Sequence, residues 1–483
     1  MDKKEHYSIS HWPDEKLIYE KMERLVSGKT PKIKKSALDD YLNYFETKCR
    51  GSKELVEEAR KYIPGGIQHN LAFNFPFPLA AAKADGPYLY DIDGNRYIDY
   101  LQSGGPTLLG SNYAIIKENA IAVINDCGPS TGLLSEYELK LAKSINKYMP
   151  WVEKFRCMAS GTEADMLAIR IARTFTDKQK IIKAGGAYHG WSDQLVYGLH
   201  IPGTGRFEAH GIPKECSANT QEFFPNDLGG LRKLLEKNEA DGSGTAAVIL
   251  EPFGPESGTR PVTKDFNYKA RELCDEFGAL LIFDEVVTAF RIGPGGAAGY
   301  FGIKPDLTVF GKIVSGGYPS AGGVGGREDV MSAVAAGVKA SVKRAYSGGT
   351  LTANPLSCAA GHFAIEEIVA TDAAAKAGEN GDRLTEGINR LIEKHDMPFV
   401  AWNTGSIVHF EVAGMMYVDP RNPDVGAVLH EKQKAVEEFG AALTANGVIT
   451  LAGSRIYTSM ADNEQTIEDT LAAFDDVMGN VEL

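Results

Sequence analysis

Two apolar runs that follow each other along the chain, ALLIFDEV from residue 279 and DLTVF from residue 306, constrain the fold most. Each has the length and character of a strand buried in a parallel sheet. The first run contains Asp284 and Glu285 near its end, and the second is followed by Gly311 and Lys312. Lys312 lies 28 residues after Asp284, which matches one strand, crossover and strand. We therefore expect both side chains at the same carboxyl-terminal edge of the sheet.

A carboxylate and a lone lysine at neighbouring strand ends suit an aldehyde cofactor that has a basic ring nitrogen. Pyridoxal 5'-phosphate (PLP) is held as a Schiff base by a lysine that can lose its proton, and a carboxylate keeps its pyridine nitrogen protonated. The alternative is that Asp284 caps the following segment and that Lys312 is a solvated strand end. This alternative suits each residue taken alone, whereas the pair favours a cofactor site.

The composition excludes several classes of protein. A chain of 483 residues with 43% hydrophobic and 24% charged residues is typical of a soluble globular protein with two or three domains. The net charge of −13 leaves no basic surface for nucleic acid or an anionic membrane. Neither is therefore expected as a partner.

The cysteines and the first residues indicate a cellular location. Six cysteines are scattered without a CxxC pair or zinc-like spacing, which is typical of reduced thiols in the cytosol. The segment MDKKEHYSISHWPDEK has no apolar core of a secretory signal. No apolar run approaches the roughly 18 residues of a membrane span. We expect a cytoplasmic protein.

The order of the patterns predicts an α/β fold. Residues 1–60 are predicted as a helical extension or arm, and residues 61–110 as the N-terminal segment of a small domain with a hairpin at Asp93-Gly94. From 111 to 355, apolar runs alternate with helical patterns, which predicts a large domain with a mostly parallel sheet. Residues 356–483 mix strands and amphipathic helices and are predicted to complete the smaller α+β domain.

The tetrapeptide Ser160-Gly161-Thr162-Glu163 follows the run KFRCMA and opens a helical pattern. Backbone N–H groups at a helix start, together with two hydroxyls, form a site for a phosphate. Ser160 and Glu163 also have the spacing of a capping box, which many helices carry without a ligand. Both interpretations stay open for this motif taken alone.

Four further residues have both a functional and a plain interpretation. Tyr188 and His189 follow the run IIKAGG, where a ring can stack on a planar cofactor or can simply be part of the core. Val286 points the same way as Asp284 along a strand, so it is either a packing surface beneath the cofactor ring or a core valine. Thr350, after two glycines, offers a hydroxyl to an anion or belongs to a plain turn.

Motifs of other enzyme classes are missing. The triplet Gly28-Lys29-Thr30 lacks the preceding glycine of a P-loop, because position 23 is Glu23. No GxGxxG follows a strand, and no GxSxG is present.

Six motifs in order resemble the class III aminotransferases of PLP fold type I, and most of all their glutamate-1-semialdehyde 2,1-aminomutase branch. They are SGTEA, AYHG, LEP, IFDEVVTAFR, PDLTVFGKIVSGGYP and GGTLTANPLSCAAG. The resemblance extends from PGGI at residue 64 to the carboxyl terminus. It implies a seven-stranded, mostly parallel large domain and a smaller domain built from the N- and C-terminal segments.

The resemblance also implies a role for each matching residue. Lys312 is the Schiff-base lysine and proton shuttle, and Asp284 pairs with the ring nitrogen. The phosphate is bound by Gly161 and Thr162, next to Ser160. Further cofactor contacts are implied for Tyr188, which stacks on the ring, and for His189, Glu251 and Val286. Thr350 reaches the phosphate bound by the other subunit, which implies a homodimer with shared active sites. Ser103 and Gly105 match the substrate-side loop.

Two departures from this branch concern the substrate. The branch places an arginine for the substrate carboxylate shortly after the PGG turn, whereas PGGIQHNLAFNF has none, and the next arginine is Arg96. Gly104 stands where the branch has a tryptophan, which enlarges the pocket. Both changes argue against glutamate-1-semialdehyde. Gln68 and His69 occupy the region, either as neutral hydrogen-bonding groups or as ordinary loop residues.

The expected function is a PLP-dependent aminotransferase that moves an amino group between an amino acid or amine and a keto acid or aldehyde. An aminomutase or an amino acid racemase on the same scaffold is the alternative. A noncatalytic relative that binds PLP or a partner protein is a third interpretation, against which the intact Lys312 and Asp284 argue.

Overall fold

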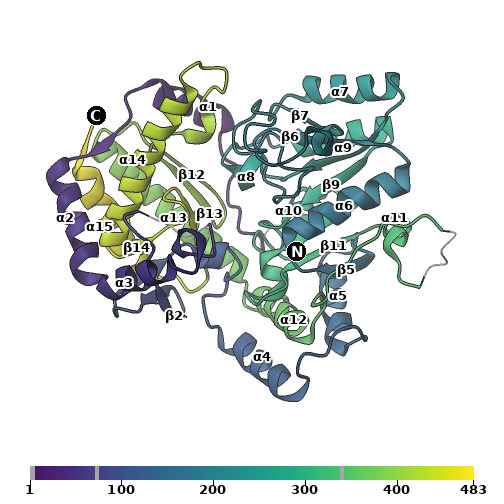
Figure 1. Ribbon diagram of the computed structural model, residues 1–483, viewed down its shortest axis with the longest axis horizontal. Helices are drawn as coiled ribbons and strands as arrows, with labels where there is room; N and C mark the ends of the chain where they lie inside the picture. Colours follow the sequence, from purple (N-terminus) through teal and green to yellow (C-terminus); the bar gives the residue numbers. More distant parts are fainter. Residues whose placement is uncertain (1–5, 71–74, 338–341) are drawn as a thin grey trace. The chain divides into compact units, whose positions relative to one another are not determined.

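A computed structural model describes residues 6–70, 75–337 and 342–483 (Figure 1). The chain divides into two compact units. The first contains residues 114–372 together with the first residues of the chain, and the second contains residues 8–113 and 373–483. Each unit is described below by itself.

The first unit is built on a seven-stranded sheet. Its strand order is β5-β11-β10-β9-β8-β6-β7. The bounds are β5 (Lys154–Met158), β11 (Gly322–Gly326), β10 (Leu307–Gly311), β9 (Leu280–Asp284), β8 (Thr245–Leu250), β6 (Lys180–Ala184) and β7 (Thr220–Phe223). Strand β11 runs antiparallel to both of its neighbours, and the other neighbouring pairs are parallel. The prediction of a mostly parallel seven-stranded sheet is confirmed.

The helices of the first unit alternate with these strands and surround the sheet (Figure 1). They are α4 (Ala114–Asp126), α5 (Glu136–Tyr148), α6 (Gly161–Thr176), α7 (Leu228–Ala240), α8 (Pro255–Gly258), α9 (Phe266–Phe277), α10 (Gly296–Phe301), α11 (Glu328–Met331) and α12 (Pro355–Ala370). Helix α6 buries Leu167, Ala168 and Ile171 in one core with Ile249 and Ile282 of the central strands. The period of its apolar residues therefore fits one face of a helix on a sheet.

The second unit combines small sheets with helices from both ends of the chain. One sheet has the order β14-β4-β3-β2, another β12-β13-β15, and β1 pairs with β16. The strands are β1 (Lys32–Ile33), β2 (Ala81–Asp85), β3 (Tyr88–Asp91), β4 (Arg96–Asp99), β12 (Val400–Thr404), β13 (Ile407–Glu411), β14 (Val448–Ile449), β15 (Arg455–Tyr457) and β16 (Val481–Glu482). The predicted hairpin at Asp93-Gly94 is confirmed, because β3 and β4 are antiparallel partners on either side of it.

The N-terminal extension belongs to the core of the second unit. Its helices are α1 (Glu15–Ser27), α2 (Lys35–Lys48) and α3 (Arg50–Ala59), and the remaining helices are α13 (Ala373–Lys394), α14 (Val425–Ala445) and α15 (Glu464–Gly479). Met22 and Leu25 of α1 pack on Val400 and Trp402 of β12. Residues 8–60 are thus integrated by burial of apolar side chains. The predicted domain boundaries themselves remain predictions.

Within the described ranges, every helix is too short or too polar to cross a bilayer.

Candidate active site

Asp284 and Lys312 lie at one edge of the large sheet. Strands β9 and β10 are parallel, and Asp284 is the register partner of Val309. Strand β10 continues for two residues to Gly311, and Lys312 opens the short 3-10 helix η4 (Lys312–Ser315). Lys312 has φ +48°, a left-handed conformation that residues with a side chain rarely adopt. The parallel pairing confirms that the two residues share the carboxyl edge.

Val286 joins this edge to the start of α6. A Cβ added to Gly161 would lie 3.0 Å from one Val286 methyl, and a Cβ added to Gly311 would lie 2.8 Å from the other. The two glycines therefore let the helix start and the end of β10 approach the same side chain. In the same way, a Cβ on Gly190 would overlap Thr162. The loop after β6 thus closes on the helix start.

Ser160 is the N-cap of α6 and accepts a hydrogen bond from the backbone N–H of Glu163 at 3.2 Å. The Glu163 carboxylate accepts from the backbone N–H of Ala159, not from that of Ser160, so the capping box is shifted by one residue. A cavity of about 760 Å³ lies beside this helix start, with Ser160, Thr162 and Trp191 among its lining residues. The cap and an anion site are compatible at this helix terminus.

His189 is the buried partner of Asp284. Its Nδ1 lies 2.7 Å from Asp284 Oδ2, and both side chains are almost fully buried. Burial lowers the pKa of His189, although Asp284 acts in the opposite direction. A neutral imidazole with its proton on Nδ1 then donates to the Asp284 carboxylate, whose other oxygen accepts from the backbone N–H of Val286 at 3.0 Å.

Tyr188 lies in the same loop, and 44% of the residue is exposed. Its ring stacks against His200, with 6.4 Å between the ring centroids and 24° between the planes. Burial alone would lower the pKa of His200, but hydrogen bonds to Glu208 and Glu256 raise this pKa to about 10. The cationic imidazole ring of His200 therefore lies against one side of the Tyr188 ring.

Both carboxylate oxygens of Glu251 accept hydrogen bonds from the backbone of two loops, the one that carries Tyr188 and the one that carries Glu256. It accepts hydrogen bonds from the backbone N–H groups of Tyr188 at 3.0 Å and Glu256 at 2.7 Å, and from Ser257. Burial, followed by the charge of Asp284, raises the pKa of Glu251 to about 8. In this structure the carboxylate positions the backbone of Tyr188.

Lys183 was missed by the sequence patterns. It lies in β6, is fully buried, and donates to the backbone carbonyls of Ala187 at 2.7 Å and Tyr197 at 2.9 Å. Burial lowers the pKa of Lys183 to about 8. The lysine therefore fixes both ends of the loop that carries Tyr188 and His189. A lysine inside the apolar run KIIKA was the signal that could have revealed it.

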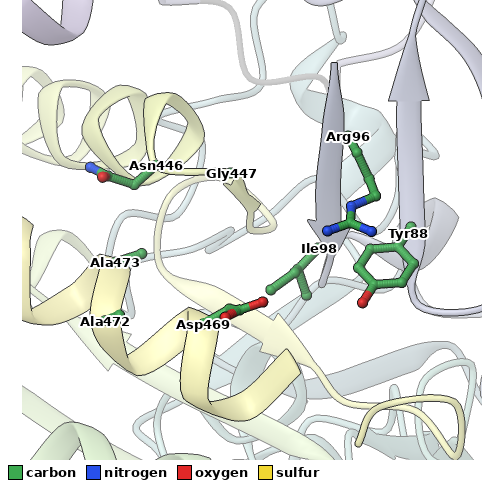
Figure 2. A pocket seen from close by; sticks show the side chains of 8 residues that line it. All are labelled: Tyr88, Arg96, Ile98, Asn446, Gly447, Asp469, Ala472 and Ala473. Carbon is green, nitrogen blue, oxygen red and sulfur yellow. The ribbon is translucent and has the colours of Figure 1, made fainter. Parts of the chain in front are cut away.

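The remaining predicted residues belong to other segments of the chain. Thr350 is exposed in the turn before α12. Ser103, Gly105, Gln68 and His69 belong to the second unit, and residues 71–74 of the segment without an arginine are outside the described residues. Arg96 sits 4.5 Å from the ring centroid of Tyr88. Figure 2 shows it at a pocket of about 310 Å³ that Asp469 of α15 also lines.

The residues at the sheet edge fit PLP. The glycines next to Val286 and Thr162 bring backbone close to the site, a carboxylate is fixed by a neutral histidine, and a lysine follows the neighbouring strand. His189 Nε2 is buried with no hydrogen-bond partner among the described residues. A sheet of this order with these groups at its carboxyl edge defines a PLP-dependent enzyme of fold type I.

Residues 72–473 match the family model of the class III aminotransferases. The chain belongs to this family and is a PLP-dependent aminotransferase.

Solved structures of similar proteins agree with this family assignment. An ω-transaminase from Sphaerobacter thermophilus is 27% identical, with a TM-score of 0.78 over 91% of this chain and 99% of that one. A β-phenylalanine aminotransferase from Variovorax paradoxus is 28% identical, with a TM-score of 0.77 over 92% and 97%. A glutamate-1-semialdehyde aminomutase from Pseudomonas aeruginosa shares the fold at 23% identity and a TM-score of 0.79, over 92% and 98%.

Proposed function

We propose that Lys312 is the lysine that binds the cofactor and moves the proton, and that Asp284 is the partner of the ring nitrogen. The observation that carries this assignment is the parallel register of β9 and β10, which places both residues at one edge, with Asp284 fixed by His189 at 2.7 Å. A neutral histidine leaves the negative charge on Asp284, which stabilises a protonated ring nitrogen.

The other residues hold the cofactor in place. The start of α6, with Gly161 and Thr162, binds the phosphate through backbone N–H groups and a hydroxyl. Tyr188 covers one face of the ring and Val286 the other. Glu251 acts through the backbone of Tyr188, because its oxygens are engaged by loop N–H groups.

PLP, when bound, supplies a ring that withdraws electrons from the substrate carbon. With PLP bound, Lys312 would move the proton: its Nζ would take the proton from the carbon that bears the amino group and would later return it. The left-handed backbone of Lys312 sets the direction in which this side chain leaves the strand end.

For the substrate, we propose an amine or an amino acid whose carboxylate is held without the usual arginine. Two solved relatives are named for the ω-transaminase class and for β-phenylalanine, so amino groups away from an α-carbon are the first donors to test. Ser103, Gly105, Gln68 and His69 are the proposed substrate-side residues. An aminomutase or a racemase is the second candidate, because the aminomutase scaffold is shared.

An amine panel tests the reaction. The PLP-loaded enzyme is mixed with β-phenylalanine, simple amines and α-amino acids, and the cofactor absorbance at roughly 410–430 nm is followed. An aminotransferase leaves pyridoxamine phosphate and a free carbonyl product, whereas a racemase leaves neither. If no member of a broad panel changes the spectrum, the noncatalytic interpretation replaces this one.

A lysine variant tests the assignment of Lys312. Lys312→Ala should lose turnover and the absorbance at roughly 410–430 nm. Lys304→Ala is the matched control, because Lys304 is exposed in the loop before β10. An unchanged spectrum in Lys312→Ala contradicts the assignment.

We also propose a cytoplasmic homodimer in which Thr350 reaches the phosphate of the partner's site. Thr350 is exposed, and the same unit exposes Leu133 (86%), Leu134 (82%) and Leu351 (60%). Apolar side chains exposed to this extent favour a protein partner. All six cysteines are free thiols, which fits a reducing compartment.

A further inference from the structure

Asp165 is a buried carboxylate to which neither the sequence motifs nor the proposed mechanism gives a role. It lies in the second turn of α6 and is 1% exposed, between the core residues Ala164 and Leu167. Its Oδ1 is buried without a hydrogen-bond partner among the residues that the structure describes. Such a group is costly in a helix that faces a sheet, so its presence requires an explanation.

Asp165 lies beside the pair formed by His189 and Asp284. One side-chain oxygen or nitrogen from each of the three residues lies within 4.8 Å of the other two, and all three residues are buried. His189 uses Nδ1 for Asp284, while its Nε2 is buried and has no partner among residues 6–70, 75–337 and 342–483. Two buried polar atoms that lack partners among the described residues thus belong to residues of one cluster.

The surroundings decide the charge of Asp165. Acidic side chains face it from β9 (Asp284) and from the end of β8 (Glu251), and the opposing basic group is Lys183 in β6. Burial first, and then the charges of Asp284 and Glu251, raise the pKa of Asp165 well above its usual range. These surroundings favour the neutral carboxylic acid form of Asp165, which can donate a proton.

We propose that Asp165 is a positioning residue that stores one proton for the His189–Asp284 pair and supplies it when a basic ring nitrogen is placed against Asp284. This inference rests on the proposed role of Asp284. Asp165 acts on the cofactor only through His189.

The proton transfer balances without a co-reactant. The O–H bond of Asp165 breaks as an N–H bond forms at His189 Nε2, and the Nδ1–H bond breaks as Asp284 gains the proton. With a basic ring nitrogen placed against it, Asp284 would then donate this proton to that nitrogen. Asp165 and Asp284 end as carboxylates, His189 is neutral with its proton on the other nitrogen, and the ring carries the positive charge.

Calorimetry of cofactor binding tests the proposal. PLP is titrated into the full-length apoenzyme in two buffers of different ionisation enthalpy, at a pH at which the ring nitrogen of free PLP is deprotonated. The difference in heat counts the protons taken up from solvent. Asp165→Asn keeps the shape but holds no proton to give, so it should take up about one proton per site more than the unchanged protein.

Two further variants sharpen the result. His189→Gln keeps an amide donor towards Asp284 but cannot pass a proton, so it should show the same extra uptake. Asp462→Asn is the control, because Asp462 is a buried aspartate of the second unit and should leave the count unchanged. A merely structural role of Asp165 would change affinity or Tm but not the proton count.

The outcomes separate the two proposals. If PLP binds but Asp165→Asn and His189→Gln both take up as many protons as the unchanged protein, the role of Asp165 is wrong and the site stands. If Asp165→Asn does not fold or does not bind PLP, the number of protons that His189→Gln takes up decides whether the role of Asp165 stands. If the unchanged apoenzyme does not bind PLP, both proposals fall.

Discussion

Asp284 and Glu285 are neighbours in the chain, yet their carboxylates lie in different surroundings. Asp284 is held by His189 at the sheet edge. Glu285 faces the other way and accepts hydrogen bonds from Thr288 and from the backbone N–H groups of Ala297 and Ala298 at 2.6 and 2.9 Å. Burial raises the pKa of Glu285 to about 7, against the effect of these donors. At the scale of the residue, contacts decide how each of the two carboxylates is held.

Asp284→Asn should lower the rate of amino transfer by about 100-fold or more, the order expected when a group that controls a proton is lost. An amide cannot balance the charge of a protonated ring nitrogen. Steady-state kinetics with the best donor of the amine panel gives the measurement. Glu285→Gln is the control and should retain most of the activity while lowering Tm. Equal losses in both variants would contradict the assignment of Asp284.

Glu251 should make the stability of the apoenzyme dependent on pH. Its pKa rises from 4.5 to about 8 on folding, so its contribution is complete below about pH 4.5 and is lost as the pH rises to about 8. Glu251→Gln should therefore flatten the fall in Tm across this window. The glutamine side chain also replaces one oxygen, which now accepts a hydrogen bond from a backbone N–H group, by an NH2 donor. Tm should therefore be lower at every pH. A pH profile that keeps its slope in the variant would show that Glu251 is not responsible.

At the scale of the element, helix α12 sets the position of η4, the turn that begins with Lys312. A Cβ on Gly361 would overlap the backbone carbonyl oxygen of Val314. The glycine thus allows the helix to pack directly on the turn. The same use of small residues brings the start of α6 and the end of β10 onto Val286. Close packing of backbone, more than loop length, positions Lys312.

Gly361→Ala should reduce the free energy of unfolding by about 1–3 kcal/mol, because the added methyl group forces the helix and the turn apart. Activity should fall as well, since η4 begins with Lys312. Gly426→Ala is the matched control: Gly426 is also in a helix but has open space around its Cβ position, and should gain up to about 1 kcal/mol. Denaturant unfolding of both variants measures these free energies. An unchanged free energy of unfolding in Gly361→Ala would show that the contact between Gly361 and Val314 is not tight.

At the scale of the whole molecule, the chain extends beyond the part that defines its family. The family match begins at residue 72, but α1 and α2 bury apolar residues in the second unit. Met22 and Phe45 are 0% and 1% exposed, and Phe45 packs with Phe77 and Ala441. Residues 8–60 are therefore needed to complete a core, whatever else they do.

The exposed leucines allow a test of assembly. Replacement of both Leu133 and Leu134 by Asp should shift the protein from dimer to monomer, because burying two unpaired carboxylates in an apolar interface is unfavourable. Light scattering after size-exclusion chromatography measures the mass. Leu483→Asp is the control, since Leu483 is also exposed (57%) but belongs to the second unit. A monomeric unchanged protein, or a dimer that survives the double change, would exclude this surface.

Much of the fold was predictable because its information is local. Buried strands of a parallel sheet show as continuous apolar runs, and the turn at Asp93-Gly94 shows in its residue types. The pairing of Asp284 with Lys312 was predictable because consecutive parallel strands end at the same edge. The hydrogen bonds of Lys183 and the position of Asp165 beside His189 and Asp284 were not predictable in this way. The residues that surround each of them come from separate strands and loops.

The sequence by itself determined the class of sheet, the edge at which the site lies and the candidate lysine, because each depends on short runs and on what ends them. Only the tertiary structure decided that His189, and not a nearer residue, fixes Asp284, and that Asp165 joins them from α6. The reason is physical. Burial sets the protonation of these groups, and burial depends on the packing of segments that are far apart in the chain.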